Sequence, residues 1–339
     1  MQNSRTELAN RRLQHLRAVS LCLVAAILAG LEAVTVGSRH LDLPAALRGV
    51  SPDHEILLQL RLPRALLALW TGGALALAGV LFQALLRNSL ATPYTLGVSG
   101  GASLGAVLAI FFGLGSAGAV SGISVAACAG SAVVLALNVV AASGRSRMSA
   151  TSLLLAGVTI NSMCGAAILF ISSIAGFMQS FAVTRWLMGS MDAPEYRTLL
   201  WLSLLLAPVC GIVFWYSRQW NVIAVGDTWA AVRGINTRRL LLIGCIAGSI
   251  LTGSVTALTG PIGFIGLIVP HALRLWLGAD HRVLAPCSFL IGAAFLAVCD
   301  ILSRTILAPV EVPVGAITAL LGGPFFIWML NGYRRSLPV

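Results

Sequence analysis

The sequence predicts an all-α polytopic membrane protein with about ten transmembrane helices. Three observations support this prediction: 58% of the residues are hydrophobic and only 10% are charged, the mean hydropathy is +0.92, and apolar stretches of about 20 residues recur along the chain. A soluble domain of this length would carry roughly 25% charged residues. A soluble protein is therefore excluded, and without long linkers the chain is expected to form one transmembrane domain over residues 1–339.

Ten apolar stretches are the candidate spans. They cover residues 17–37, 62–86, 93–113, 118–142, 150–174, 196–216, 239–258, 262–278, 284–305 and 313–332. Hydropathy alone allows eight to ten, because 93–113 and 262–278 are rich in glycine and proline. Such stretches pack closely against other helices or form broken helices that line a cavity.

The first stretch follows basic residues, which is the layout of a signal sequence. Its apolar run continues through Ala33 to Gly37 without a small-residue cleavage site. We interpret it as an uncleaved first span that follows a tail of residues 1–16.

The charged residues alternate between the two sides of the predicted spans. The chain has no lysine, and its 22 arginines divide into fifteen on one side, with three acidic residues, and seven on the other, with eight. The first side carries Arg5, Arg11, Arg12, Arg17, Arg87, Arg145, Arg147, Arg218, Arg233, Arg238, Arg239, Arg274, Arg282, Arg334 and Arg335, with Glu7, Asp227 and Asp280. The second carries Arg39, Arg48, Arg61, Arg64, Arg185, Arg197 and Arg304, with Glu32, Asp42, Asp53, Glu55, Asp192, Glu195, Asp300 and Glu311.

An excess of arginine marks the cytoplasmic side of a membrane protein. Ten spans with both termini cytoplasmic fit this distribution. The net charge of +11 therefore reflects topology, and no nucleic-acid partner is expected.

Two polar segments are expected to fold. In residues 40–60, Asp42 followed by Pro44 predicts a capped short helix outside the membrane. In residues 218–239, the longest cytoplasmic loop, Asp227 is expected to cap a short helix that Gly234 ends. Trp229 would be exposed on that helix, either for a partner protein or for lipid headgroups.

Motifs for nucleotide and zinc binding are missing from the sequence. Without lysine there is no P-loop, and HExxH does not occur. The seven cysteines lie in apolar stretches without metal-ligand spacing, as expected for packing residues. The chain is therefore not expected to be an enzyme, and any ATP hydrolysis is assigned to another polypeptide.

Several motifs occur in a characteristic order. They are Arg61-Leu62-Pro63-Arg64, the run Gly79, Gln83, Arg87-Asn88 and Pro93 through Leu96-Gly97, then Leu155-Ala156-Gly157, Trp186 through Ser190, Gly226-Asp227 to Gly234, Gly263 through His271, Arg274, Asp280-His281-Arg282, Asp300, Arg304, Glu311 through Gly315 and Thr318. From about residue 55 the chain thereby resembles the FecCD/BtuC-like family of ABC permeases for iron siderophores, heme and cobalamin.

The chain departs from the family pattern at Ser89, Arg233 and Thr259, where the family usually has Pro, Leu and Ala. Of these, Arg233 adds a charge to the helix that is expected to contact the ATPase.

The resemblance implies a type II ABC importer permease in a bacterial inner membrane. Its partners would be a second copy of the chain, two ATP-binding cassette ATPase subunits, a periplasmic or extracellular substrate-binding protein and membrane lipid. The chain itself would bind no cofactor, and the ATPase would bind ATP and Mg. Translocation would proceed by alternating access.

Candidate sites follow from charge placement and from the resemblance. Arg61, Arg64 and Arg304 are candidates for docking the binding protein, with local charge neutralisation as the alternative, because Asp300 precedes Arg304 by four residues. The candidate ATPase-coupling residues are Gly226, Asp227, Thr228, Trp229, Ala230, Ala231, Val232, Arg233 and Gly234.

The remaining candidates have equally plain structural alternatives. Ser149, Thr151 and Ser152 resemble a cytoplasmic gate, or else cap the helix that follows. Arg185 is a possible contact for an anionic cargo, or an interfacial anchor beside Trp186. His271 is a packing residue rather than a heme ligand.

The alternative function is an ion-coupled secondary transporter of a small solute. Such carriers keep ionisable groups at mid-membrane, whereas Glu32 and Asp300 lie near the outer ends of spans. The sequence therefore favours the importer permease.

Overall fold

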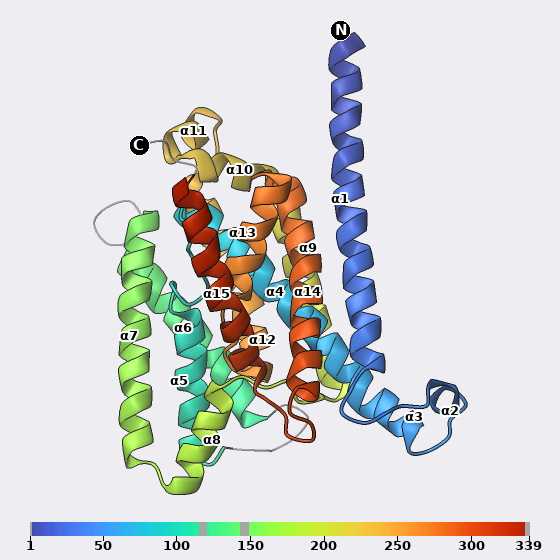
Figure 1. Ribbon diagram of the computed structural model, residues 1–339. Coiled ribbons are helices and arrows are strands. Elements are labelled where there is room, and N and C mark those ends of the chain that lie inside the picture. The colour runs from blue at the N-terminus through green and yellow to red at the C-terminus, as the bar shows by residue number, and fades with distance from the viewer. Residues whose placement is uncertain (1, 115–120, 143–148, 336–339) are drawn as a thin grey trace.

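The computed structural model describes residues 2–114, 121–142 and 149–335, and over these ranges the chain is helical without strands (Figure 1). Seven described helices contain a stretch long and apolar enough to cross a membrane. They are α1 (Gln2–Thr35), α4 (Leu62–Leu86), α6 (Gly122–Ala142), α7 (Ala150–Ile174), α9 (Tyr196–Trp215), α12 (Thr237–Thr259) and α14 (His281–Thr305).

Three shorter apolar helices bring the described spans to the predicted ten. They are α5 (Val98–Phe111), α13 (Ile265–Leu277) and α15 (Val314–Arg335). The remaining elements are α2 (Leu43–Leu47), α3 (Asp53–Glu55), the π-helix η1 (Ile56–Arg61), α8 (Phe177–Leu187), α10 (Ser217–Val225) and α11 (Asp227–Val232). The prediction of an all-helical membrane protein is confirmed.

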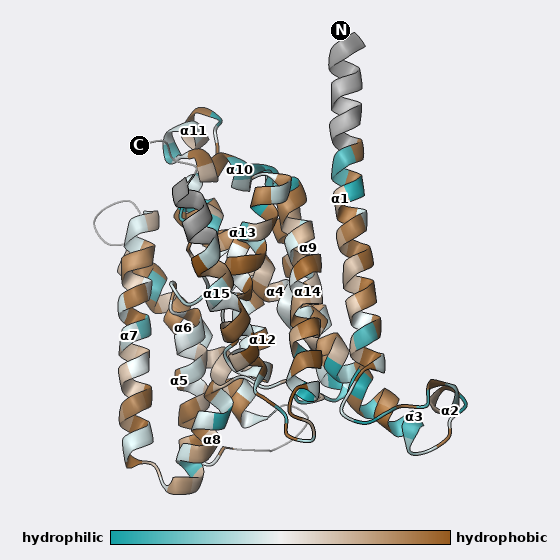
Figure 2. Cartoon of the chain, in the orientation of Figure 1, coloured by the Kyte–Doolittle hydropathy of each residue, from teal (hydrophilic) through white to brown (hydrophobic). Residues whose placement is uncertain are grey.

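Different short helices lie at the two ends of the bundle. The N terminus, α10 and α11 lie at one end, which we call the basic end, and α2, α3 and α8 lie at the opposite end (Figure 1). Hydrophilic residues gather towards both ends, with apolar helices between them (Figure 2). α1 begins at Gln2, so the described part of the expected tail continues the first span as helix.

The central helix is α4, which contacts α14, α12, α13 and α1. Glycine allows its backbone to approach two of these neighbours closely. A Cβ atom on Gly72 would lie 2.1 Å from the carbonyl oxygen of Gly292, and one on Gly79 would lie 1.9 Å from that of Gly266. These contacts fix α4 against α14 and α13.

Two of the shorter helices follow irregular backbone, as their glycine and proline content indicated. α5 follows a turn that ends at Gly97, and α13 follows a segment in which Gly260 and Phe264 both have φ near +69°. A cavity of about 400 Å³ is lined from both segments, by Thr92 and Tyr94 and by Gly263, Phe264 and Leu267. Non-helical backbone at membrane depth is tolerated where it borders such a cavity.

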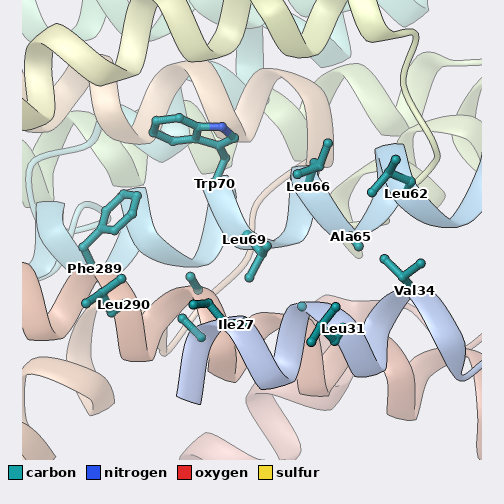
Figure 3. A pocket seen from close by; sticks show the side chains of 13 residues that line it. Ile27, Leu31, Val34, Leu62, Ala65, Leu66, Leu69, Trp70, Phe289 and Leu290 are labelled. Atoms are coloured by element: carbon teal, nitrogen blue, oxygen red, sulfur yellow. The ribbon is translucent and has the colours of Figure 1, made fainter. Parts of the chain in front are cut away.

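A groove of about 430 Å³ lies between α1, α4 and α14 at one edge of the bundle. Ile27, Leu31 and Val34 of α1 lie along it opposite Leu66 and Leu69 of α4 (Figure 3). The lining is almost wholly apolar, so the groove offers no charged group to a polar cargo.

The short polar helices were predicted in part. Asp42 caps α2 by accepting a hydrogen bond from the backbone N–H of Ala45 at 3.3 Å. Gly234, with φ of +69°, follows Arg233, the C-cap residue of α11, and ends the helix as expected. The predicted capping role of Asp227 is wrong: Gly226 occupies the N-cap position, and the Asp227 carboxylate pairs with Arg87 instead.

Candidate functional site

At the basic end, α10 forms a platform for α11. Trp220 and Ile223 of α10 are buried, and the Trp220 indole N–H donates to the carbonyl oxygen of Val213 at 2.9 Å. α10 packs against α4 and α14. The position of α11 is therefore coupled to the core of the bundle rather than to a free loop.

The helix α11 projects from this platform between two glycines. Gly226 has φ of +151° and Gly234 has φ of +69°, conformations that side-chain-bearing residues rarely adopt. Ala230 is buried, whereas Trp229 is 59% and Val232 is 79% exposed. The exposed tryptophan and valine form an apolar protrusion on a short, anchored helix.

One ion pair ties this helix to the central span. Arg87, the C-cap residue of α4, donates through Nε to the carbonyl oxygen of Ile223 at 3.0 Å and pairs through Nη2 with Asp227. Arg87 itself has φ of +48°. Movement of α11 would therefore be transmitted to the end of α4.

At the opposite end, Arg61 and Arg304 hold the end of α1. Arg61 donates through Nη1 to the carbonyl oxygen of Thr35 and through Nη2 to that of Arg39, and Arg304 donates through Nη2 to that of Ala33 at 2.8 Å. Both arginines are 5% exposed. They satisfy carbonyl groups left unpaired where α1 ends.

Arg64 and Arg304 also share one buried carboxylate. Asp300 is fully buried and lies 2.9 Å from Arg64 Nε and 3.2 Å from Arg304 Nε. Arg64 Nη1 further contacts Glu311, whose side chain is 50% exposed, at 2.9 Å. The Asp300–Arg304 pair considered from the sequence is thus present, and the docking role of the three arginines stays a prediction.

The candidate gate residues lie where α7 begins, at the basic end. Ser149 is its N-cap residue and accepts a hydrogen bond from the backbone N–H of Ser152 at 3.1 Å. Their hydroxyl oxygens are 2.9 Å apart, and Thr151 is exposed. The capping alternative is therefore correct for Ser149, and it does not conflict with a gate at the same place.

The other singled-out residues lie apart from these clusters. Arg185 is exposed in the last turn of α8 at the opposite end. His271 is half-buried in α13, and its Nδ1 has no hydrogen-bond partner among the described residues. No group of three or more His, Cys, Asp or Glu side chains within the described ranges is arranged to hold a metal ion.

Sequence reasoning missed the polar contacts that join distant segments. Glu311 meets Arg64 across 247 positions, and Asn221 donates to Asp280 across 59. The charge pattern placed Arg64 and Glu311 on the same side, but it carried no signal for either contact.

Comparisons with known proteins agree with this geometry over almost the whole chain. The sequence model of the FecCD transport family matches residues 21–331. The uncharacterized ABC transporter permease protein YvrB of Bacillus subtilis is 40% identical over 324 residues, which cover 89% of this chain and 90% of that protein.

Two further relatives are named for the compound that they transport. The hemin transport system permease protein HmuU of Yersinia pestis is 38% identical over 331 residues, covering 96% of this chain and 99% of that protein. The vitamin B12 import system permease protein BtuC of Citrobacter koseri is 37% identical over 280 residues, covering 82% and 83%.

Solved structures share the fold. An ABC transporter in an inward-facing conformation, assigned to the metal-chelate type, superposes with a TM-score of 0.81 at 27% identity, covering 94% of this chain and 99% of that one. PsaBC from Streptococcus pneumoniae, solved in complex with Fab, gives a TM-score of 0.52 at 17% identity, covering 81% and 92%, which supports the likeness of fold alone.

Proposed function

The chain belongs to the FecCD transport family, and from this premise we propose that it translocates an iron chelate, heme or cobalamin by alternating access. It is the multi-pass permease subunit of an ABC importer. The cargo class follows from relatives that are named for hemin and vitamin B12. No catalytic role is proposed for any residue, and ATP with Mg would be bound by the ATPase partner.

The observation that carries the proposal is α11. It is held between Gly226 and Gly234, exposes Trp229 and Val232, and is joined to α4 through the Asp227–Arg87 pair. An ATPase that grips this helix would move it as a rigid body, and α10 and Arg87 would pass the movement to the transmembrane core. Coupling residues 226–234 would thus link ATP binding to the opening of the path.

We place the basic end in the cytoplasm, so that both termini are cytoplasmic. Fifteen of the 22 arginines belong to this side, as the positive-inside rule requires. The membrane would be the bacterial inner membrane, and the opposite end would face a periplasmic or extracellular binding protein.

The complex would contain two permease and two ATPase subunits. α7 supports a second copy of the chain as neighbour, because only 11% of its most apolar stretch is buried within one chain. The cargo path would run between the copies, past the cavity lined by Tyr94 and Phe264, with Ser149, Thr151 and Ser152 as the cytoplasmic gate. Arg185, exposed at the outer end, is available to an anionic cargo.

Coexpression with the cognate ATPase and binding protein tests the function. We expect a complex with two permease and two ATPase subunits whose ATP hydrolysis rises when the loaded binding protein is added. Ferric siderophores, heme and cobalamin are then screened on the binding protein. A chain that purifies alone and moves solute under an ion gradient would establish the secondary transporter instead.

Docking is tested by replacing Arg61 and Arg304 together with glutamate. Loss of stimulation by the binding protein is the expected result, with Arg48→Glu, an exposed arginine of the same outer side, as the matched control. Because Arg61 and Arg304 also hold the end of α1, thermal stability is measured in parallel. Normal stimulation of the double variant would refute docking at these residues.

A further inference from the structure

A polar cavity of about 560 Å³ lies at the basic end beside the start of α14. Its walls come from the C-terminal ends of α4 and α13, from α10 and from the first residue of α14. Polar side chains in the lining include Gln83, Arg87, Asn221, Arg274, Asp280 and His281. The volume falls within the range of about 300–1,000 Å³ that is usual for ligand pockets.

Two arginines around this cavity are neutralised within the chain. Arg87 pairs with Asp227, and Arg282 pairs with Asp280 at 2.8 Å. Asp280 also accepts hydrogen bonds from the backbone N–H of Arg282 at 3.0 Å and from Asn221 Nδ2 at 2.8 Å. Burial alone would raise the pKa of Asp280, but the bonds from Arg282 and Asn221 lower it to about 2, so this carboxylate stays ionised with its own partners.

Arg274 is the arginine of this cavity that lacks a carboxylate partner among the described residues. Its Nη2 donates to Gln83 Oε1 at 2.9 Å, and Gln83 Nε2 donates to the carbonyl oxygen of Gly266 at 3.1 Å. Gln83 therefore fixes one side of the guanidinium group and leaves its other N–H donors for an incoming acceptor. The C-terminal dipole of α13 offers Arg274 only about half a charge.

A second observation comes from His281, which is 3% exposed. Asn221 Oδ1 accepts from the backbone N–H of His281 at 2.8 Å and lies 2.7 Å from its Nδ1, so Nδ1 is the protonated ring nitrogen. The other ring nitrogen, Nε2, has no hydrogen-bond partner among the described residues. Because Nδ1 carries the proton, Nε2 is an acceptor, so a donor such as a water or a main-chain N–H completes it and a carboxylate does not.

We propose that the cavity receives the carboxylate of an Asp or Glu side chain from the ATPase subunit, and that this carboxylate pairs with Arg274. The inference rests on the proposed function, since it requires an ATPase at the basic end. The cavity adjoins α11 through the Arg87–Asp227 pair, so a subunit that covers α11 also reaches the cavity. A guanidinium–carboxylate pair in this half-buried place would add direction and specificity to a contact that α11 makes through apolar side chains.

The absence of lysine from the chain allows a direct test. In the Arg274→Lys variant, the introduced lysine is the one side-chain amine of the permease. A water-soluble carbodiimide applied to the assembled permease–ATPase complex then forms an amide between this amine and a carboxylate in contact with it. We expect a permease–ATPase cross-link, and mass spectrometry of the joined peptides identifies the Asp or Glu.

The matched control is Arg282→Lys, because Arg282 directly follows the lining residues Asp280 and His281 in the chain but already pairs with Asp280. Its lysine should not cross-link to the ATPase. An assembled Arg274→Lys complex without the cross-link, or one that cross-links no more than the Arg282→Lys complex, overturns the inference. If the unmodified permease does not assemble with the ATPase at all, the proposed function fails instead, so the two failures are distinguishable.

Affinity measurements provide an independent readout. Arg274→Gln should weaken ATPase binding about tenfold or more, since losing a charge-assisted pair exceeds 1.4 kcal/mol. Combining it with neutralisation of the identified ATPase carboxylate should add little further loss. If inorganic phosphate instead stabilises the isolated permease against heat, and Arg274→Gln removes that effect while ATPase affinity is unchanged, the cavity is a site for a free anion and the carboxylate assignment is wrong.

Discussion

Asp300 is the residue on which the polar cluster at the opposite end depends. Its fully buried carboxylate lies between Arg64 at 2.9 Å and Arg304 at 3.2 Å. Taking a carboxylate out of water is costly, and the two guanidinium groups offset that cost only while all three charges are present. Asp300 also positions Arg64, whose other contact is the half-exposed Glu311.

Asp300→Asn should therefore lower the free energy of unfolding by about 3 kcal/mol, because two buried arginines lose their shared counter-charge. Thermal unfolding of the purified permease in detergent measures the change. Glu311→Gln is the control: its carboxylate is half-exposed, so its removal should cost less than about 1 kcal/mol. Equal losses for both variants would contradict a central role for Asp300.

The roles of individual arginines were only partly predictable from the sequence. The charge pattern placed Arg61 and Arg304 on the side opposite the arginine-rich one, and they lie at the end of the bundle opposite α10 and α11. It did not indicate that both side chains would donate to carbonyl oxygens near the end of α1. Every residue has a main-chain carbonyl, so a sequence pattern cannot single out which one accepts, and the acceptors of Arg61 lie 22 to 27 positions away. The Asp300–Arg304 pair was predictable because a spacing of four residues joins side chains on one helix.

In α11, Trp229 and Val232 are exposed while Ala230 is buried. Trp229→Ala should weaken binding of the ATPase by about 2 kcal/mol or more, as expected for a central aromatic contact, without changing the thermal stability of the isolated permease. Copurification and titration of the ATPase measure this. Trp215→Ala is the matched control, since Trp215 is 82% exposed at the C-terminal end of α9; a similar loss there would mean that α11 is not the contact.

The close packing of α4 against α13 depends on the absence of a side chain at Gly79. In Gly79→Ala, the new Cβ would lie 1.9 Å from the carbonyl oxygen of Gly266, so the helices must separate. Overpacking of this kind costs typically about 1–3 kcal/mol, and thermal unfolding should show it. Gly165→Ala in α7, where nothing lies within 4 Å of the added atom, should instead leave stability unchanged or raise it by up to about 1 kcal/mol.

Hydropathy predicted the long elements well and the short ones unevenly. The boundaries of α4 and α7 match the predicted stretches, because apolar runs of 25 residues leave little freedom in a bilayer. α8 was not predicted, since its eleven residues include Gln179, Ser180, Thr184 and Arg185 and fall short of a span. Asp227 was misassigned as a cap because the competing partner, Arg87, lies 140 positions away in the sequence.

At the scale of the whole molecule, the unequal distribution of arginines between the two sides determines the proposed membrane orientation. The sequence pattern assigns fifteen arginines with three acidic residues to the side of α10 and α11, and seven arginines with eight acidic residues to the other. The coupling helix, the gate residues and the cavity around Arg274 all lie at the basic end, whereas Arg64, Asp300 and Arg185 lie at the other. The ATPase and binding-protein proposals therefore depend on the same orientation.

That orientation yields a prediction for the intact protein. A green fluorescent protein fused after Val339 should fluoresce, because this reporter folds in the cytoplasm, and alkaline phosphatase fused after Arg48 should be active, because it requires an exported location. The reason is that arginine-rich segments are retained on the cytoplasmic side during insertion, and the ten apolar helices of the described residues return the chain to the side on which it began. A dark C-terminal fusion together with an inactive phosphatase would invert the topology. It would then place α11 and Arg274 beyond the reach of any cytoplasmic ATPase, and both the coupling and the cavity proposals would fall together.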